Sequence, residues 1–165
     1  MPAKRSSQGA RSAYQQHLFE NIPLYTTRLV CEKHFPFRER IQVTSPADAA
    51  EILIEYFRDR DREEFILLLL STANVIEGMS QISVGGLAAS IVEPRQVFKV
   101  AILANAAAVI LSHNHPSANP EPSREDIRIT KQLVEAGKIM GVPVHDHLII
   151  GGDAYTSLAE CGLMA

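Results

Sequence analysis

The sequence has 165 residues, of which 46% are hydrophobic, and this is enough apolar material to fill the core of one domain. Lys and Arg number 16 against 19 for Asp and Glu, so the formal charge of −3 gives no broad positive surface for nucleic acid. No apolar stretch is long and charge-free enough to cross a membrane, and no secretion signal is visible. Cys31 and Cys161 lie far apart without metal-type spacing, so we expect a reduced, cytoplasmic protein.

The N-terminal part of the chain differs in character from the rest. Residues 1–21 are polar with scattered basic side chains, and this composition predicts a solvated arm. Residues 24–31 alternate weakly between apolar and polar and favour a strand. We therefore divide the chain into an N-terminal segment, residues 1–43, and a folded domain, residues 44–165.

The domain begins with a helix and continues with alternating strands and helices. Ser45 before Pro46 is typical of a helix start, with serine as N-cap and proline at the first helical position, and this helix runs to the charged break at Arg58. Short strands mixed with helices indicate an α/β protein, a three-layer α/β/α sandwich with a mixed sheet. The strands are predicted at residues 65–71, 75–84, 89–92, 106–111 and 144–150, and the further helices at 94–103 and 123–140.

The motif His113-Asn114-His115-Pro116 follows the run at residues 106–111, which is short and continuously apolar, as in a strand buried on both faces. Side chains alternate along a strand, so both imidazoles point to one face while Asn114 points to the other. Functional sites in α/β sheets commonly form at strand ends. We therefore expect His113 and His115 to converge there.

A carboxylate reaches the same place from the next helix. Asp126 lies on the apolar stripe of that helix, in its first turn, so it points toward the sheet, where an unpartnered carboxylate is costly. Two histidines and one aspartate leave a tetrahedral zinc ion one open position, where a water has its pKa lowered to about 7. Ligand type alone leaves iron and manganese open, and zinc is the metal we expect.

A local alternative exists for the same residues. Ser123 and Asp126 have the spacing of an N-terminal capping box, and a histidine near a strand end is often a hydrogen-bonded structural residue. The two interpretations are compatible, because Asp126 can bind metal while Ser123 begins the helix.

The residues His113-x-His115-Pro116 followed by Ser123-x-x-Asp126 resemble the JAMM motif of MPN-type zinc metallopeptidases. From about Thr44 to the C-terminus the sequence is similar to the bacterial RadC branch of that superfamily, most clearly at residues 93–99, 105–108, 113–152 and 155–158. The resemblance implies an MPN/JAMM-like fold of cytidine-deaminase-like architecture. It also implies that His113, His115 and Asp126 are zinc ligands and that Ser123 assists at the tetrahedral intermediate.

The family also needs an upstream glutamate as general acid and base, close to the water on the metal. RadC-like sequences carry it two residues before a phenylalanine, and here Glu63 stands two residues before Phe65. Glu64 faces the other way on an extended strand, so one of the two at most reaches the site. We prefer Glu63, and the alternative for either residue is a solvated strand end.

A second histidine pair, His145 and His147, is not expected to bind metal, because no further ligand of suitable spacing joins it. His147 is expected to be a core residue or one that orients a group near the metal. We expect His145 to be exposed.

Three functions are compatible with these residues. The first, which we expect, is a zinc-dependent metallopeptidase or isopeptidase that hydrolyses an amide bond of a substrate protein with a metal-activated water. The second is a DNA repair or recombination accessory protein of the RadC type, without direct catalysis. RadC-like proteins usually carry a helix-hairpin-helix segment, and no such pattern precedes Thr44, so direct nucleic-acid binding is not expected. The third is a non-catalytic MPN-like scaffold, but such proteins lose ligands, and here the set is complete.

Overall fold

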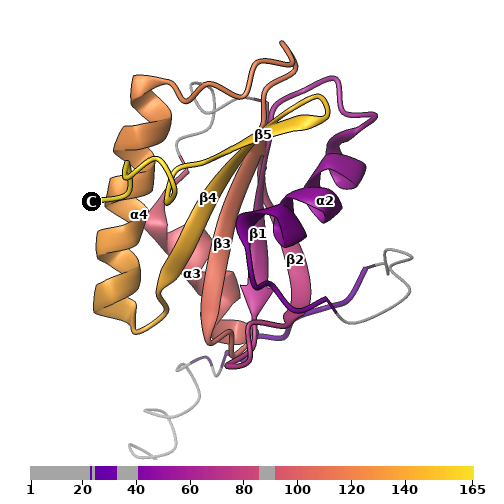
Figure 1. The fold of residues 1–165 in the computed structure, drawn as a ribbon. Helices are drawn as coiled ribbons and strands as arrows, with labels where there is room; N and C mark the ends of the chain where they lie inside the picture. The colour runs from indigo at the N-terminus through magenta and orange to yellow at the C-terminus, as the bar shows by residue number, and fades with distance from the viewer. Residues whose placement is uncertain (1–22, 24, 33–40, 86–91) are drawn as a thin grey trace, which may run out of the picture.

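The computed structural model describes residues 23, 25–32, 41–85 and 92–165. Within these ranges, strands and helices alternate much as the sequence predicts (Figure 1). In chain order the elements are α2 (Pro46–Phe57), β1 (Glu64–Leu70), β2 (Ile76–Val84), α3 (Pro94–Leu103), β3 (Ala108–Asn114), α4 (Arg124–Met140), β4 (Val144–Gly151) and β5 (Ala154–Ser157).

The five strands form one mixed sheet in the order β2-β1-β3-β4-β5. Strands β3 and β4 are parallel and are connected through α4, whereas the other neighbouring pairs are antiparallel. Figure 1 shows α2 on one face of the sheet and α3 and α4 on the other. The fold is therefore the expected α/β/α sandwich, and the crossover brings the start of α4 close to the end of β3.

Two hydrophobic cores lie on the two faces of the sheet, because successive residues of a strand point to opposite sides. On β1, Phe65, Leu67 and Leu69 join the core beneath α3 and α4. The residues between them, Ile66, Leu68 and Leu70, join the core beneath α2. Strands β1 and β3 are buried along their whole length, and this explains their continuous apolar sequences.

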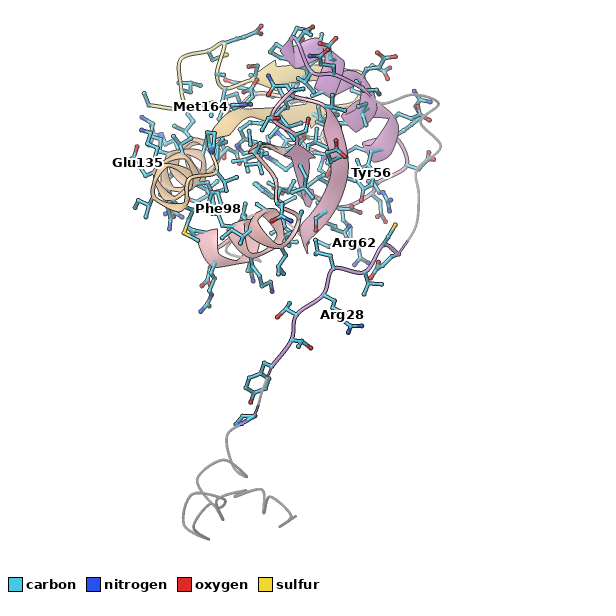
Figure 2. All side chains as sticks on the ribbon, turned by 90° about the horizontal axis from the view of Figure 1, so that it is seen from below. Arg28, Tyr56, Arg62, Phe98, Glu135 and Met164 are labelled. Atoms are coloured by element: carbon cyan, nitrogen blue, oxygen red, sulfur yellow. The ribbon has the colours of Figure 1, made fainter. Side chains whose placement is uncertain are left out.

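The structure corrects one of the predicted elements and adds one. Residues 25–31, most of the strand expected at 24–31, form no strand and are exposed, and Figure 2 shows Arg28 on a stretch that runs away from the sheet. A strand requires a neighbouring strand to hydrogen-bond to, and weak alternation does not supply one. The arm at 1–21 and most of the strand expected at 89–92 lie outside the described residues, and Val92 is in no strand. The added element is β5, whose four residues are too few to show a period.

Within the described ranges, no helix is both long and apolar enough to cross a membrane. Cys31 and Cys161 lie on the surface.

Candidate metal centre

Two histidines converge at the end of β3. His113 is 0% exposed and pairs with Phe65 on β1 and with Ile149 on β4. His115 follows the strand, and its backbone N–H donates to the carbonyl oxygen of Ile150 over 2.7 Å. Its ring Nδ1 donates to the carbonyl oxygen of Asn119 at 2.8 Å, so Nε2 is the nitrogen that offers a lone pair to a metal when the ring is neutral. The two Nε2 atoms lie 3.0 Å apart, so the predicted convergence is confirmed.

Asp126 completes a group of three ligands from the first turn of α4. It is 1% exposed, and its Oδ1 lies 3.3 Å from Nε2 of His113 while its Oδ2 lies 3.6 Å from Nε2 of His115. Ligands at 2.0–2.1 Å from a tetrahedral zinc ion are roughly 3.3 Å from one another, which is close to these separations. One ligand atom from each residue lies within 4.8 Å of the others, so His113, His115 and Asp126 could hold a metal ion.

The same aspartate caps its helix. The backbone N–H of Asp126 donates to Ser123 Oγ over 3.1 Å, and the backbone N–H of Ser123 donates to Asp126 Oδ2 over 2.7 Å. This is the reciprocal capping box that the spacing predicts. Capping and a ligand position therefore coexist at Asp126, because the carboxylate has lone pairs for both.

The ionised form of Asp126 is stabilised by its neighbours. Burial by itself raises the pKa of this carboxyl, but hydrogen bonds from His113 and His115 outweigh burial and bring the pKa well below its usual range. The reciprocal effect raises the pKa of His115, mainly through its hydrogen bond with Asp126. The carboxylate is therefore ionised at neutral pH, as a metal ligand must be.

Glu63 and Glu64 have different surroundings. Glu64 is buried on the α2 side, where its Oε2 accepts from the Tyr56 hydroxyl at 3.0 Å and from Gln81 Nε2 at 2.5 Å. Burial and this contact with Glu64 raise the pKa of Tyr56 to about 12. Glu63 is half-buried and lies close enough to His115 for its charge to help raise the pKa of that imidazole. Of the two glutamates, Glu63 is therefore the one whose charge acts on His115.

Asn114 is a residue near the site that the sequence argument did not single out. Its Oδ1 accepts from the backbone N–H of Glu64 at 2.8 Å, and its Nδ2 donates to the carbonyl oxygen of Arg62 at 2.9 Å. The amide thus holds the backbone on both sides of Glu63. An asparagine at the end of an otherwise apolar strand was the available signal.

His147 and Thr130 lie behind the ligands. His147 is 0% exposed, and its Nε2 lies 2.9 Å from Nδ1 of His113, whereas His145 is exposed. Burial lowers the pKa of His147 well below its usual value, so this imidazole is neutral. Its Nδ1 lies 2.5 Å from the hydroxyl of Thr130, another residue that the sequence argument missed. Thr130 gave no signal, because it reads as an ordinary position on the helix.

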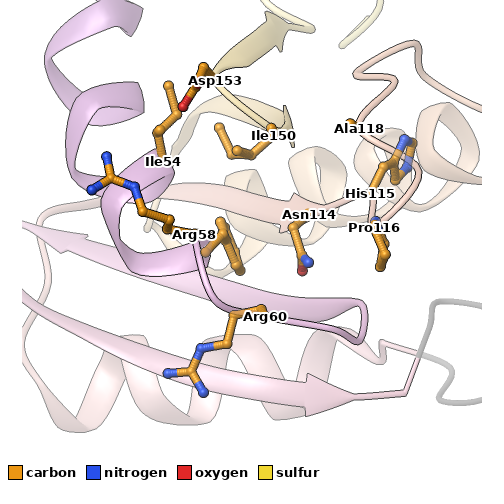
Figure 3. Close-up of a pocket in the computed structure, with 11 residues that line it drawn as sticks. Ile54, Arg58, Arg60, Asn114, His115, Pro116, Ala118, Ile150 and Asp153 are labelled. Atoms are coloured by element: carbon orange, nitrogen blue, oxygen red, sulfur yellow. The ribbon is translucent and has the colours of Figure 1, made fainter.

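A hollow of about 200 Å³ opens on the α2 side of the same end of the sheet. Ile54 and Ile150 supply part of its apolar wall, and Arg58 and Arg60 lie on the side opposite His115 (Figure 3). The hollow touches His115, but Nε2 of that ring faces His113 and Asp126. It therefore adjoins the metal centre without containing it.

The sequence was compared with known protein families and with curated proteins. A model of the RadC-like JAB domain matches residues 43–163. The chain belongs to this family. As a RadC-like JAB domain, it combines the family's α/β sandwich with a His-His-Asp group at the expected place.

Similar curated proteins are named UPF0758 proteins. One from Salinibacter ruber is 63% identical over 126 residues, which are 76% of this chain and 54% of that protein. One from Desulforamulus reducens is 50% identical over 129 residues, 78% of this chain and 57% of that protein. One from Alkaliphilus metalliredigens is 50% identical over 123 residues, 74% of this chain and 53% of that protein. The RadC-like JAB chain therefore spans about half the length of the curated relatives it matches.

Proposed function

We propose that this protein is a zinc-dependent metallopeptidase or isopeptidase, which hydrolyses an amide bond of a substrate protein. The observation that supports the proposal is the close approach of three ligand atoms, the Nε2 atoms of His113 and His115 and a carboxylate oxygen of Asp126. One ligand atom from each of the three residues lies within 4.8 Å of the others. Three protein ligands are the usual set of a catalytic zinc site, since a fourth position stays open for water or substrate. Membership of the RadC-like JAB family supports the same site.

His113, His115 and Asp126 would hold the metal. When bound, zinc lowers the pKa of a water molecule to about 7 and polarises the amide carbonyl. His113 and His115 contribute neutral nitrogen donors, and Asp126 contributes the negative charge that favours a cation. This mixed nitrogen and oxygen set is why zinc is the metal we propose.

Glu63 would move the proton. Its carboxylate would take a proton from the attacking water and would pass that proton to the nitrogen of the leaving amine. Ser123 would support the reaction at the substrate oxygen. Its oxygen accepts from the backbone N–H of Asp126, and a hydroxyl can donate at the same time, so its proton is available for the developing oxyanion.

The substrate class we propose is a peptide or an isopeptide-linked protein, in the cytoplasm, where the cysteine content of the chain predicts the protein to be. The hollow beside His115 offers room for residues that flank the scissile bond. Its apolar wall at Ile54 and Ile150 suits an aliphatic side chain.

The two glutamates at the start of β1 provide a test with a matched control. The zinc-loaded protein, Glu63→Gln and Glu64→Gln are each incubated with a mixed peptide library, and cleavage is followed by mass spectrometry. We expect Glu63→Gln to retain its zinc and to lose about a hundredfold or more of the cleavage rate, because proton transfer is lost while the ligands stay. Glu64→Gln is expected to cleave at a rate close to that of the parent.

The opposite ranking would overturn the assignment. A Glu63→Gln variant as active as the parent, with an inactive but folded Glu64→Gln, would move the acid and base role to Glu64. Absence of cleavage by the zinc-loaded parent on peptides and on isopeptide-linked dipeptides would contradict the proposed function.

A further inference from the structure

A chain of hydrogen bonds runs from the back of His113 into the helix layer. His113 Nδ1 lies 2.9 Å from Nε2 of His147 on β4, and His147 Nδ1 lies 2.5 Å from the hydroxyl of Thr130 on α4. That hydroxyl donates to the backbone carbonyl oxygen of Asp126 over 2.5 Å. His113, Thr130 and His147 are all 0% exposed, so these groups find their partners in one another and not in solvent.

The number of protons in this series of hydrogen bonds determines which group donates in each bond. The carbonyl oxygen of Asp126 can only accept, so the single hydroxyl proton of Thr130 points toward it. Thr130 Oγ1 must then accept from Nδ1 of His147, which therefore carries a proton. Burial disfavours the charged imidazolium, so Nε2 of His147 carries none. The proton between the two rings consequently belongs to Nδ1 of His113.

We propose that Thr130 and His147 are positioning residues that keep the proton of His113 on Nδ1 and so present its Nε2 lone pair to the metal. Phe65 packs against both rings. It stacks on His113 with ring centroids 6.2 Å apart and planes 5° apart, and it meets His147 edge to face with centroids 5.5 Å apart.

The two histidine ligands meet the same requirement in different ways. His115 donates to the carbonyl oxygen of Asn119, which can only accept and therefore fixes the tautomer by itself. Nε2 of His147 can accept or donate, depending on the tautomer of that ring. His147 therefore fixes the tautomer of His113 only because Thr130 fixes the tautomer of His147. Thr130 thus acts on the metal centre from two hydrogen bonds away.

The isosteric pair Thr130→Val and Thr130→Ser separates this role from packing. Valine keeps the shape but offers no acceptor, so His147 gains by moving its proton to Nε2 and donating to His113, whose proton must then move into the ligand position. Serine keeps the hydroxyl and loses only a methyl group. We expect the zinc dissociation constant of Thr130→Val to be about 10- to 100-fold larger than that of Thr130→Ser. This is the usual loss of metal affinity when the hydrogen-bond partner of a ligand is removed.

The tautomer can be measured directly on the metal-free protein. Long-range proton–nitrogen NMR correlations distinguish a proton on Nδ1 from one on Nε2, and the spectrum of His113→Gln identifies the signals of His113 among the six histidines. We expect Nδ1 of His113 to carry a proton in the parent and in Thr130→Ser, and to carry none in Thr130→Val.

Two results would overturn the inference. One is an Nδ1 of His113 that carries no proton in the metal-free parent, a measurement that needs no variant to fold. The other is a folded Thr130→Val that keeps the tautomer and the zinc affinity of Thr130→Ser. The inference rests on the proposed function for its consequence, zinc binding, but its failure is distinct. A parent with the expected tautomer that binds no zinc would refute the proposed function and leave the proton assignment standing.

Discussion

Asn114 occupies the polar position between the two histidines of the motif and serves the opposite face of the sheet. Strand β1 begins at Glu64, and the backbone pairing of β1 with β3 starts at Phe65 with His113. Beyond this pair, the side-chain amide of Asn114 continues the contact between the two segments, with one hydrogen bond to the backbone of Glu64 and one to the backbone of Arg62. The backbone of Glu63 is thereby fixed at the position from which its carboxylate would act.

Replacing Asn114 by alanine tests this role at the residue scale. We expect Asn114→Ala to bind zinc as the parent does, because the ligands are untouched, and to lose about tenfold or more of the peptide cleavage rate as Glu63 moves. Loss of the two hydrogen bonds, one of them buried, should also lower the free energy of unfolding by about 1–3 kcal/mol. Zinc content, cleavage rate and chemical unfolding are measured on the same sample. A destabilised variant with an unchanged cleavage rate would show that Asn114 has a purely structural role.

Helix α2 begins with a cluster of hydrogen bonds on one carboxylate. Asp48 Oδ2 accepts from the backbone N–H groups of Thr44 and Ser45, each at 2.8 Å. It also accepts from the hydroxyl groups of the same two residues, at 2.8 and 3.1 Å. The bonds from Thr44 are the main cause that lowers the pKa of Asp48 to about 2. The lowered pKa means that this helix start is more stable with Asp48 ionised.

The lowered pKa predicts a pH dependence for the element. The stabilisation is fully present above the pKa of an unfolded aspartate, about 3.9, and is lost as the pH falls through the folded value of about 2. We therefore expect Asp48→Asn to be less stable than the parent at neutral pH, and the difference to shrink as the pH falls from 4 toward 2. Urea unfolding at a series of pH values measures it. A difference that stays constant over this range would contradict the assignment.

The end of β4 supports the loop that orients His115. A Cβ atom on Gly151 would lie 2.6 Å from the backbone nitrogen of Pro120 and 2.8 Å from the carbonyl carbon of Asn119. These contacts are closer than a side chain permits, so the loop packs here only against glycine. The carbonyl of Asn119 is also the acceptor for Nδ1 of His115. Gly151 on β4 thus allows the close packing of the loop whose Asn119 carbonyl orients His115.

Gly151→Ala should therefore weaken the metal centre without removing a ligand. We expect the displaced carbonyl of Asn119 to release His115 and to weaken zinc binding by about tenfold or more. Gly78→Ala on β2 is the matched control, since its Cβ would meet only Leu69 Cδ1 at 3.7 Å, an ordinary contact. Zinc affinity is measured by competition with a chelating dye. Equal affinities in the two variants would show that the loop does not control His115.

At the scale of the whole molecule, the sequence predicted what depends on local pattern. Strands β1 and β3 are buried on both faces and therefore appear as continuous apolar runs. The start of α4 followed from a capping box, and Asp126 followed from its place on the apolar stripe of that helix. These local features were enough to predict that the three candidate ligands lie close together.

Features that depend on contacts between distant residues were not predicted. Asn114 reaches Glu64, 50 residues earlier, and His147 reaches Thr130, 17 residues earlier, so no spacing along the chain reveals either contact. The weak alternation at residues 25–31 suggested a strand, but the described residues give it no neighbour to pair with. The sequence pattern thus predicted the candidate ligands. The residues that hydrogen-bond around these ligands are brought near them by the sheet topology, which the pattern does not show.

The zinc content of the purified protein tests the central claim most directly. The parent, His113→Ala and His145→Ala are supplied with zinc, dialysed and compared by elemental analysis; His145 is the control, since it is an exposed histidine of the same sheet. We predict about one zinc ion per chain in the parent and in His145→Ala, and little or none in His113→Ala. A parent that binds no zinc, or a His113→Ala variant that binds as much as the parent, would contradict the account.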